Sequence, residues 1–156
     1  MENISDKAFF LRNDLIERLR GIDPSTKPSW GKMNVVQMIE HMSYSLRQAN
    51  GRESYACVTP EENLPRMQAF LVSEKPFREN TPNQLLPDMP EPPKKATVED
   101  ALDELKDEIE HFFKVFEEDT ERSITNPFFG DLGYNMWVQL LYKHAWHHLR
   151  QFNVNE

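Results

Sequence analysis

The stretch TVEDALDELKDEIEHFFKVFEED, from Thr97 to Asp119, decides the fold because it is the most regular helical pattern in the chain. Its apolar side chains recur every three or four residues, which places them on one stripe of an α-helix. Thr97 can cap this helix, since Asp100 follows three residues later, close to a capping box. The opposite face is densely acidic, and we expect solvent to cover it. The stripe consists of Val98, Leu102, Leu105, Ile109, Phe112 and Phe116.

Three further stretches show the same helical period, at residues 5–22, 34–50 and 132–153. Ser5 and Gly21 are expected to begin and end the first of them. The chain shows little of the alternation that predicts β-strands. We therefore predict an all-α fold, a four-helix bundle, in a single domain over residues 1–156. The expected apolar stripe of the first helix is Phe9, Leu11, Leu15, Ile16 and Leu19.

A proline-rich segment separates the second and third of these long helices. Eight of the eleven prolines lie between Pro60 and Pro93, and the run PFRENTPNQLLPDMPEPPKK cannot form a regular element. We expect a short helix at its beginning, within residues 60–74, and a long crossover that ties two helix pairs together. The role of residues 75–93 beyond that connection stays open. A tight aromatic turn is expected in RSITNPFFGDLGYN, before the last helix.

Composition and charge exclude several classes of protein. The formal net charge of −8 opposes binding to a nucleic-acid backbone, and no basic stripe compensates for it. The only cysteine, Cys57, cannot form a disulfide within the chain and is expected to fill space in a reducing cytoplasm. No apolar run reaches the roughly 20 residues of a membrane span, and the N-terminus lacks the pattern of a secretory signal. We predict a cytoplasmic protein without a nucleic-acid or membrane partner.

Three of the five histidines lie in KHAWHHLRQF, residues 143–152. On a helical wheel, His144 and His148 fall within the buried arc of the last helix, four residues and one turn apart. His147 falls with Lys143 and Arg150 on the side expected to face solvent. His111 lies opposite the apolar stripe of its own helix and is also expected at the surface.

His41 lies at the edge of the apolar face of the second helix, so the wheel alone does not decide its orientation. Two inward histidines require partners for their ring nitrogens, and a divalent metal is one solution. Backbone carbonyls or carboxylates are another. The zinc-protease motif is excluded, because Ala145 stands where that motif has glutamate.

The segments WGKMNVVQMIEHM, NPFFG and YKHAWHHLRQF together resemble the DinB-like superfamily of four-helix metalloproteins, over about Trp30 to Phe152. The resemblance is greatest to a branch of unknown function. It implies a site for Ni²⁺ or Zn²⁺ with His41, His144 and His148 as ligands. It also implies that Gln151 lines the pocket or supports a ligand. Gly133 departs from the Ser or Thr that many relatives have at the start of the last helix.

Relatives of this kind imply two activities on a small-molecule substrate. One is transfer or isomerisation with a low-molecular-weight thiol cosubstrate, and the other is hydrolysis; both use an open metal position. Two alternatives stay open, namely a metal-binding bundle without catalysis and a helical interaction protein whose histidines are satisfied by side chains. The resemblance also implies a homodimer, with Trp146 as a candidate contact, although ordinary packing explains that residue equally well.

Overall fold

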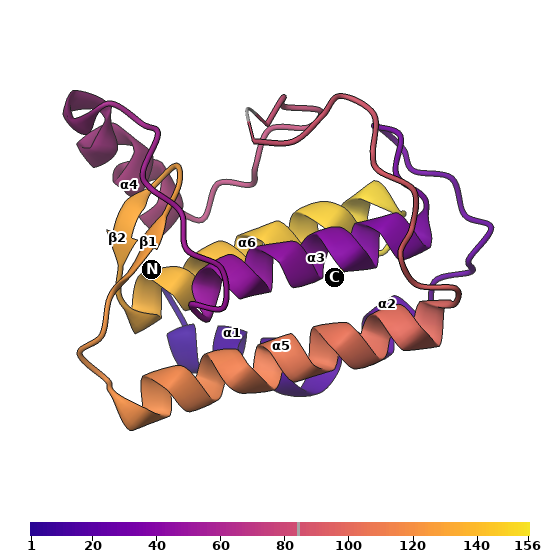
Figure 1. The fold of residues 1–156 in the computed structure, drawn as a ribbon, viewed down its shortest axis with the longest axis horizontal. Helices are drawn as coiled ribbons and strands as arrows, with labels where there is room; N and C mark the ends of the chain where they lie inside the picture. The colour runs from indigo at the N-terminus through magenta and orange to yellow at the C-terminus, as the bar shows by residue number, and fades with distance from the viewer. Residues whose placement is uncertain (84) are drawn as a thin grey trace.

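The computed structural model describes residues 1–83 and 85–156, and it confirms a mostly helical bundle (Figure 1). Four long helical segments form its body, and a two-stranded hairpin and a short helix lie at one end. Among these residues, none of the helices combines the length and the hydropathy that a membrane span needs. The elements are α1 (Ile4–Phe9), η1 (Phe10–Asp14), α2 (Leu15–Arg20), α3 (Val35–Ala49), η2 (Glu61–Asn63), α4 (Leu64–Val72), α5 (Val98–Glu118), β1 (Ile124–Asn126), β2 (Gly130–Leu132) and α6 (Tyr134–Gln151).

The first helical segment is continuous but contains a π-helical turn, η1. Residues advance less around the axis in such a turn, so Phe10 and Leu11 both face the core while Phe9 turns outward. Phe9 is 60% exposed, and its assignment to the apolar stripe is wrong. The prediction for Ser5 is also wrong, because the helix begins at Ile4 without a side-chain cap. Gly21 ends α2 as predicted.

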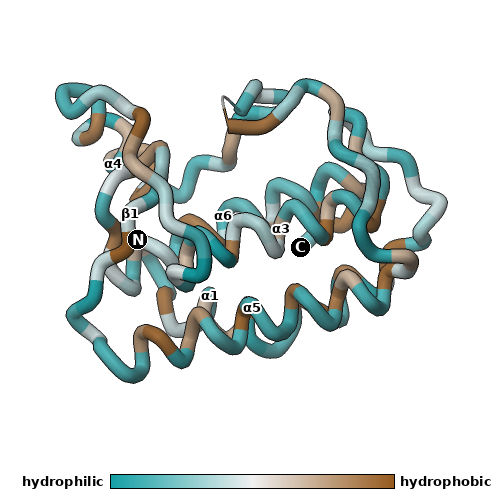
Figure 2. The backbone as a smooth tube through the Cα atoms, viewed as in Figure 1, coloured by the Kyte–Doolittle hydropathy of each residue, from teal (hydrophilic) through white to brown (hydrophobic). Residues whose placement is uncertain are grey.

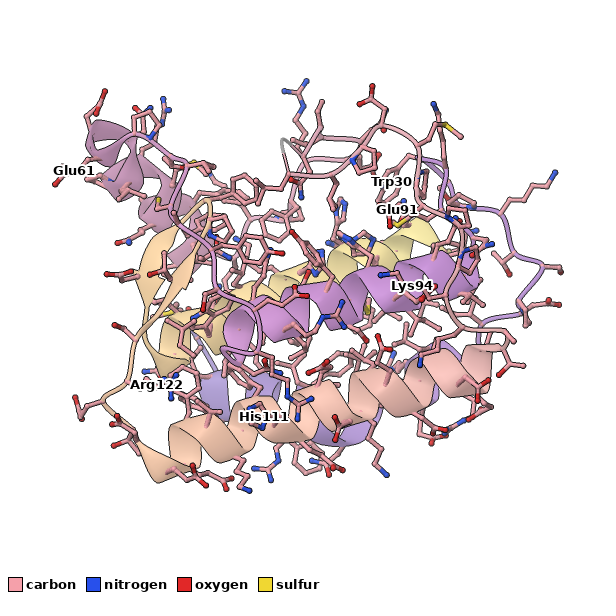
Figure 3. All side chains as sticks on the ribbon, in the orientation of Figure 1. Trp30, Glu61, Glu91, Lys94, His111 and Arg122 are labelled. Atoms are coloured by element: carbon pink, nitrogen blue, oxygen red, sulfur yellow. The ribbon has the colours of Figure 1, made fainter. Side chains whose placement is uncertain are left out.

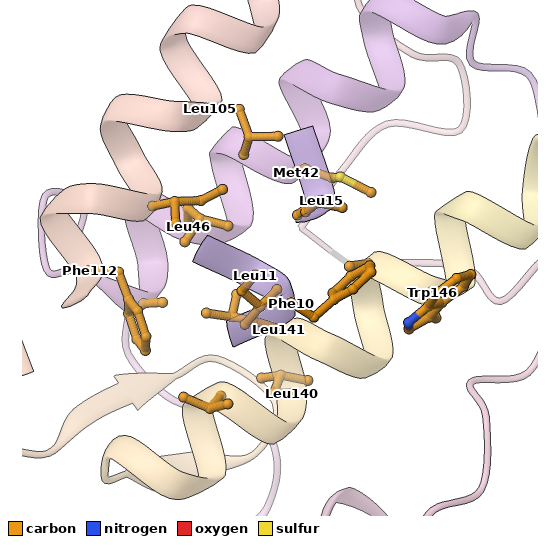
Figure 4. Packing of buried hydrophobic residues seen from close by; sticks show 14 of the residues in the cluster. Phe10, Leu11, Leu15, Met42, Leu46, Leu105, Phe112, Leu140, Leu141 and Trp146 are labelled. Carbon is orange, nitrogen blue, oxygen red and sulfur yellow. The ribbon is translucent and has the colours of Figure 1, made fainter. Parts of the chain in front are cut away.

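Helix α3 packs against α5 on one side and α6 on the other. Leu105 and Phe112 of α5 meet Met42 and Leu46 of α3 in the buried cluster, as Figure 4 shows. Apolar residues alternate with charged ones along α5, which gives the banding visible in Figure 2. The predicted α5 stripe is confirmed, since all its members are buried except Val98, which is half-buried.

Helix capping explains where α3 and α5 begin. Thr97 Oγ1 accepts a hydrogen bond from the Asp100 amide at 3.1 Å, which confirms the predicted cap. Asn34 and Gln37 form a full capping box at the start of α3, a feature not predicted from the sequence.

The acidic face of α5 is not fully solvated, contrary to the prediction. Glu108 is buried, and its Oε1 accepts hydrogen bonds from Asn50 Nδ2 at 3.0 Å and from Arg52 at 2.8 Å. Helical period alone could not reveal this, because the partners come from the end of α3 and the loop after it.

The predicted aromatic turn is a β-hairpin, in which β1 pairs antiparallel with β2. Asn126 Oδ1 accepts hydrogen bonds from the amides of Phe128 and Phe129 and so fixes the turn. Strands of three residues are too short to show alternation in the sequence. Helix α6 then begins after Gly133, which supplies no side-chain cap.

The crossover between α4 and α5, residues 73–97, is called the strap below. It passes over the α3–α6 face in Figure 1. Gln37 Nε2 of α3 donates to the Glu91 carbonyl at 2.8 Å, and the Lys94 amide donates to the Glu40 carboxylate at 3.0 Å. The strap is thus tied to α3 by hydrogen bonds. Residue 84, within the segment whose role was left open, lies outside the described residues.

Candidate metal centre

Three histidine rings converge where α3 and α6 pack together. His41 comes from α3, and His144 and His148 come from successive turns of α6. The Nε2 atoms of His41 and His144 are 3.1 Å apart, and those of His144 and His148 are 3.0 Å apart. One nitrogen from each ring lies within 4.8 Å of the others. The structure therefore brings together all three histidines that the resemblance indicated.

Gln151 fixes the ring of His148. Its Nε2 donates to the Trp30 carbonyl at 2.8 Å, which turns the amide oxygen toward His148. That oxygen accepts a hydrogen bond from His148 Nδ1 at 2.7 Å. A neutral imidazole with its proton on Nδ1 carries a lone pair on Nε2. The Nε2 lone pair of His148 is therefore directed toward the other two rings, as in many metal-ligating histidines.

The rings do not satisfy one another as hydrogen-bonding groups. His144 Nε2 faces the nitrogens of both His41 and His148. A single hydrogen on that atom cannot make linear hydrogen bonds to both neighbours. A shared cation satisfies three converging lone pairs at once, which a proton cannot do.

Burial keeps these imidazoles in the neutral form that binds metals. It lowers the pKa of His41 to about 4, and it lowers the pKa of His144 and His148 well below the usual range. The neighbouring rings add to the effect, because a charge on one disfavours a charge on the next. All three nitrogens can thus act as ligands at neutral pH.

The spacing and donor set fit a divalent transition metal. Ligand nitrogens at about 2.0–2.1 Å from one ion lie about 2.9 Å apart at a right angle and about 3.4 Å apart at a tetrahedral angle. The observed 3.0 and 3.1 Å fall between these values. Three imidazoles suit Zn²⁺ or Ni²⁺ and leave a coordination position for another group.

Aromatic side chains from two loops close over this end of α6. The ring of His147 lies between Trp30, at 5.3 Å, and Phe77 of the strap, at 6.0 Å, measured between ring centroids. Phe77 also packs against His144 at 6.5 Å. On the α3 side, Tyr44 lies 6.3 Å from His41. The trio therefore has apolar walls on two sides, which periodicity within one helix could not predict.

The remaining predictions for this region need correction. Lys143 was expected to face solvent but is buried, because its ammonium donates to the carbonyls of Phe70 and Ser73 at the end of α4. His147 and Arg150 are half-buried rather than exposed. His111 is half-buried on α5, on the other side of the molecule from Trp30 in Figure 3.

The model of the DinB superfamily matches residues 10–152, which includes all three histidines and Gln151. The search of curated proteins and the search of solved structures found no match.

Proposed function

The chain belongs to the DinB superfamily, and we propose that it is a divalent-metal-dependent enzyme that acts on a small molecule through His41, His144 and His148. The observation that carries the proposal is the convergence of three neutral imidazoles with no carboxylate among them. When bound, an ion such as Zn²⁺ or Ni²⁺ supplies Lewis-acid chemistry that lowers the pKa of a thiol or a water at its open position.

The protein's own groups would hold and orient the reactants. His41 and the α6 pair fix three ligand directions from two helices that pack against each other. Gln151 holds the His148 tautomer, and Trp30 and Phe77 exclude water from the side that the loops cover. These features support transfer of a low-molecular-weight thiol or hydrolysis as the reaction classes.

Metal content gives the first test. Protein made without an affinity tag should carry close to one Zn²⁺ or Ni²⁺ per chain by mass spectrometry. His144→Ala should lose this metal, whereas His111→Ala, the matched control on α5, should retain it. Equal metal content in the two variants would contradict the proposal.

Turnover gives the second test. Metal-loaded protein is assayed with pairs of small thiols and electrophiles, and separately with activated esters and amides. We expect one of the two panels to turn over and the activity to disappear in His144→Ala. Metal binding without turnover in either panel would favour the alternative of a metal that only stabilises the bundle. Two observations support that alternative. His148 is only 5% exposed, and the three ligands come from two helices, so a bound ion would hold these helices together.

The third reading, a helical interaction protein, receives less support. It requires side-chain partners for the three histidines, and among the described residues outside the trio only Gln151 provides one. Glu40, the carboxylate nearest in sequence to His41, instead accepts the Lys94 amide of the strap. The small-molecule partner and the homodimer remain proposals. Trp146 is buried against Phe10, with 5.3 Å between the ring centroids.

A further inference from the structure

A cavity lies between the N-terminal helix, the beginning of the strap and the C-terminal half of α6. Its volume is about 310 Å³, the lower end of the range for small-molecule sites. Pro76 lines it, whereas the next residue, Phe77, packs against His144 of the metal centre. The cavity and the metal centre are therefore neighbours separated by the beginning of the strap.

The cavity lining carries more positive than negative side chains, whereas the protein as a whole is acidic. Four cationic and three anionic side chains line it, although the chain carries a net charge of −8. Among the described residues, only one ion pair forms between these groups: Lys7 Nζ lies 2.8 Å from Glu74, with Gln139 Oε1 also at 2.8 Å. The lining charges are Lys7, Lys75, Lys143 and Arg150 against Glu2, Glu74 and Glu156.

Lys143 brings a buried charge that forms no ion pair with any described carboxylate, Glu74 acting on it only from a distance. It is 6% exposed, and its ammonium donates to the carbonyls of Phe70 at 2.9 Å and Ser73 at 3.0 Å. The ring centroids of Phe70 and Phe77 also lie near this charge, at 4.0 and 5.7 Å from Nζ. An ammonium has three donors, and carbonyls and a ring do not supply a negative charge. One donor and the full charge are thus left for a further partner.

Trp146 adds a second unsatisfied donor to the same lining. It is 4% exposed, and among the described residues its indole Nε1 makes no hydrogen bond of good geometry, although the Tyr142 side chain lies beside it. Buried donors of this kind are uncommon, because each costs the energy of desolvation without a compensating bond. Tyr142 and Trp146 also supply aromatic surface beside the cations.

We propose that this cavity binds a small organic anion, with its carboxylate or phosphate group at Lys143 and Arg150 and its apolar part against Tyr142 and Trp146. The charge excess selects for an anion, and the volume is large enough for a substituted benzene ring. The proposal does not depend on the metal or on the reaction proposed above. It assigns α6 two binding faces, one on each side of Phe77.

The test uses benzoate as the probe and benzamide, its neutral counterpart of the same shape, as the control ligand. Binding is followed in the full-length protein through the indole N–H resonance of Trp146 in nitrogen–proton NMR spectra, assigned with Trp146→Phe. Benzoate should shift this resonance in a saturable way, and benzamide should not. A phosphate counterpart, phenyl phosphate, then separates the two kinds of anionic group.

Two cavity variants and one matched control complete the experiment. Lys143→Met and Arg150→Gln should each weaken benzoate binding at least tenfold, while Lys106→Met, an exposed lysine of α5, should not change it. Arg150→Gln retains the hydrogen bonds of Lys143, so it tests the proposal even if Lys143→Met fails to fold. Equal responses to benzoate and benzamide, or no saturable shift at millimolar benzoate, would overturn it. Metal content should stay unchanged in Arg150→Gln.

Discussion

Two adjacent residues of α3, His41 and Met42, belong to two different seams of the bundle. Met42 lies in the apolar seam, formed with Leu46 of α3 and with Leu105 and Phe112 of α5. His41 lies in the histidine seam with His144 and His148 of α6. The contrast separates two kinds of stability. The apolar seam is stabilised by burial alone, so it needs no ligand and does not respond to pH. The histidine seam requires uncharged imidazoles, and its converging Nε2 atoms are satisfied together only when they share a cation.

Lowering the pH should destabilise the histidine seam, and we expect this to be the largest effect on the free energy of unfolding. The pKa of His41 falls from an ordinary value of 6.5 to about 4 on folding, so the unfolded chain binds more protons between these pH values. The free energy of unfolding of metal-free protein should therefore be greatest above pH 6.5 and fall as the pH drops to 4. His41 alone accounts for a loss on the order of 3 kcal/mol at pH 4.

The pKa values of His144, His147 and His148 are also lowered by burial, so these groups add in the same direction. Urea denaturation at a series of pH values measures the loss. His41→Gln should flatten the dependence. A free energy of unfolding that stays constant from pH 7 to 4.5 would show that the histidines are not held neutral by the fold.

Phe112→Ala should destabilise the apolar seam and leave the histidine seam unchanged. Phe112 is completely buried, and such truncations cost about 3–5 kcal/mol because a cavity remains. Denaturation at pH 7 measures this cost, with the neighbouring His111→Ala as the control. The affinity for Zn²⁺ in the folded variant should be unchanged. A large loss of affinity would mean that the two seams are coupled through α3.

The sequence predicts well what one helix determines by itself and poorly what depends on distant segments. The period of 3.6 residues identified the α5 stripe and the inward direction of His144 and His148, because each follows from one helix alone. Lys143 and Glu108 were placed wrongly, because their burial depends on partners from distant segments. The π turn that exposes Phe9 leaves no mark in the apolar period. His41 required the family resemblance, since its wheel position is on a boundary.

Gln151→Leu should weaken only the histidine seam. The change removes the acceptor of His148 Nδ1 and the donor to the Trp30 carbonyl. Loss of such a supporting group costs about 10–100-fold in metal affinity. Competition with a zinc-binding dye measures it. Gln151→Glu retains an acceptor for His148 and should recover part of the affinity; identical losses in both variants would argue that Gln151 only packs.

Thr97→Ala should have the smallest effect on stability. It should affect only the apolar seam, because Thr97 caps the N-terminal end of α5, far along the helix from Phe112. The Thr97 hydroxyl satisfies the Asp100 amide, and loss of such a cap costs about 1 kcal/mol. Denaturant titration resolves a difference of this size, and Thr97→Ser, which retains the oxygen, should restore most of it. Metal affinity should match that of the unmodified protein, because the strap is fixed to α3 before Thr97 through Glu91 and Lys94. Weakened metal binding in Thr97→Ala would instead mean that the beginning of α5 helps to position the strap over the histidines.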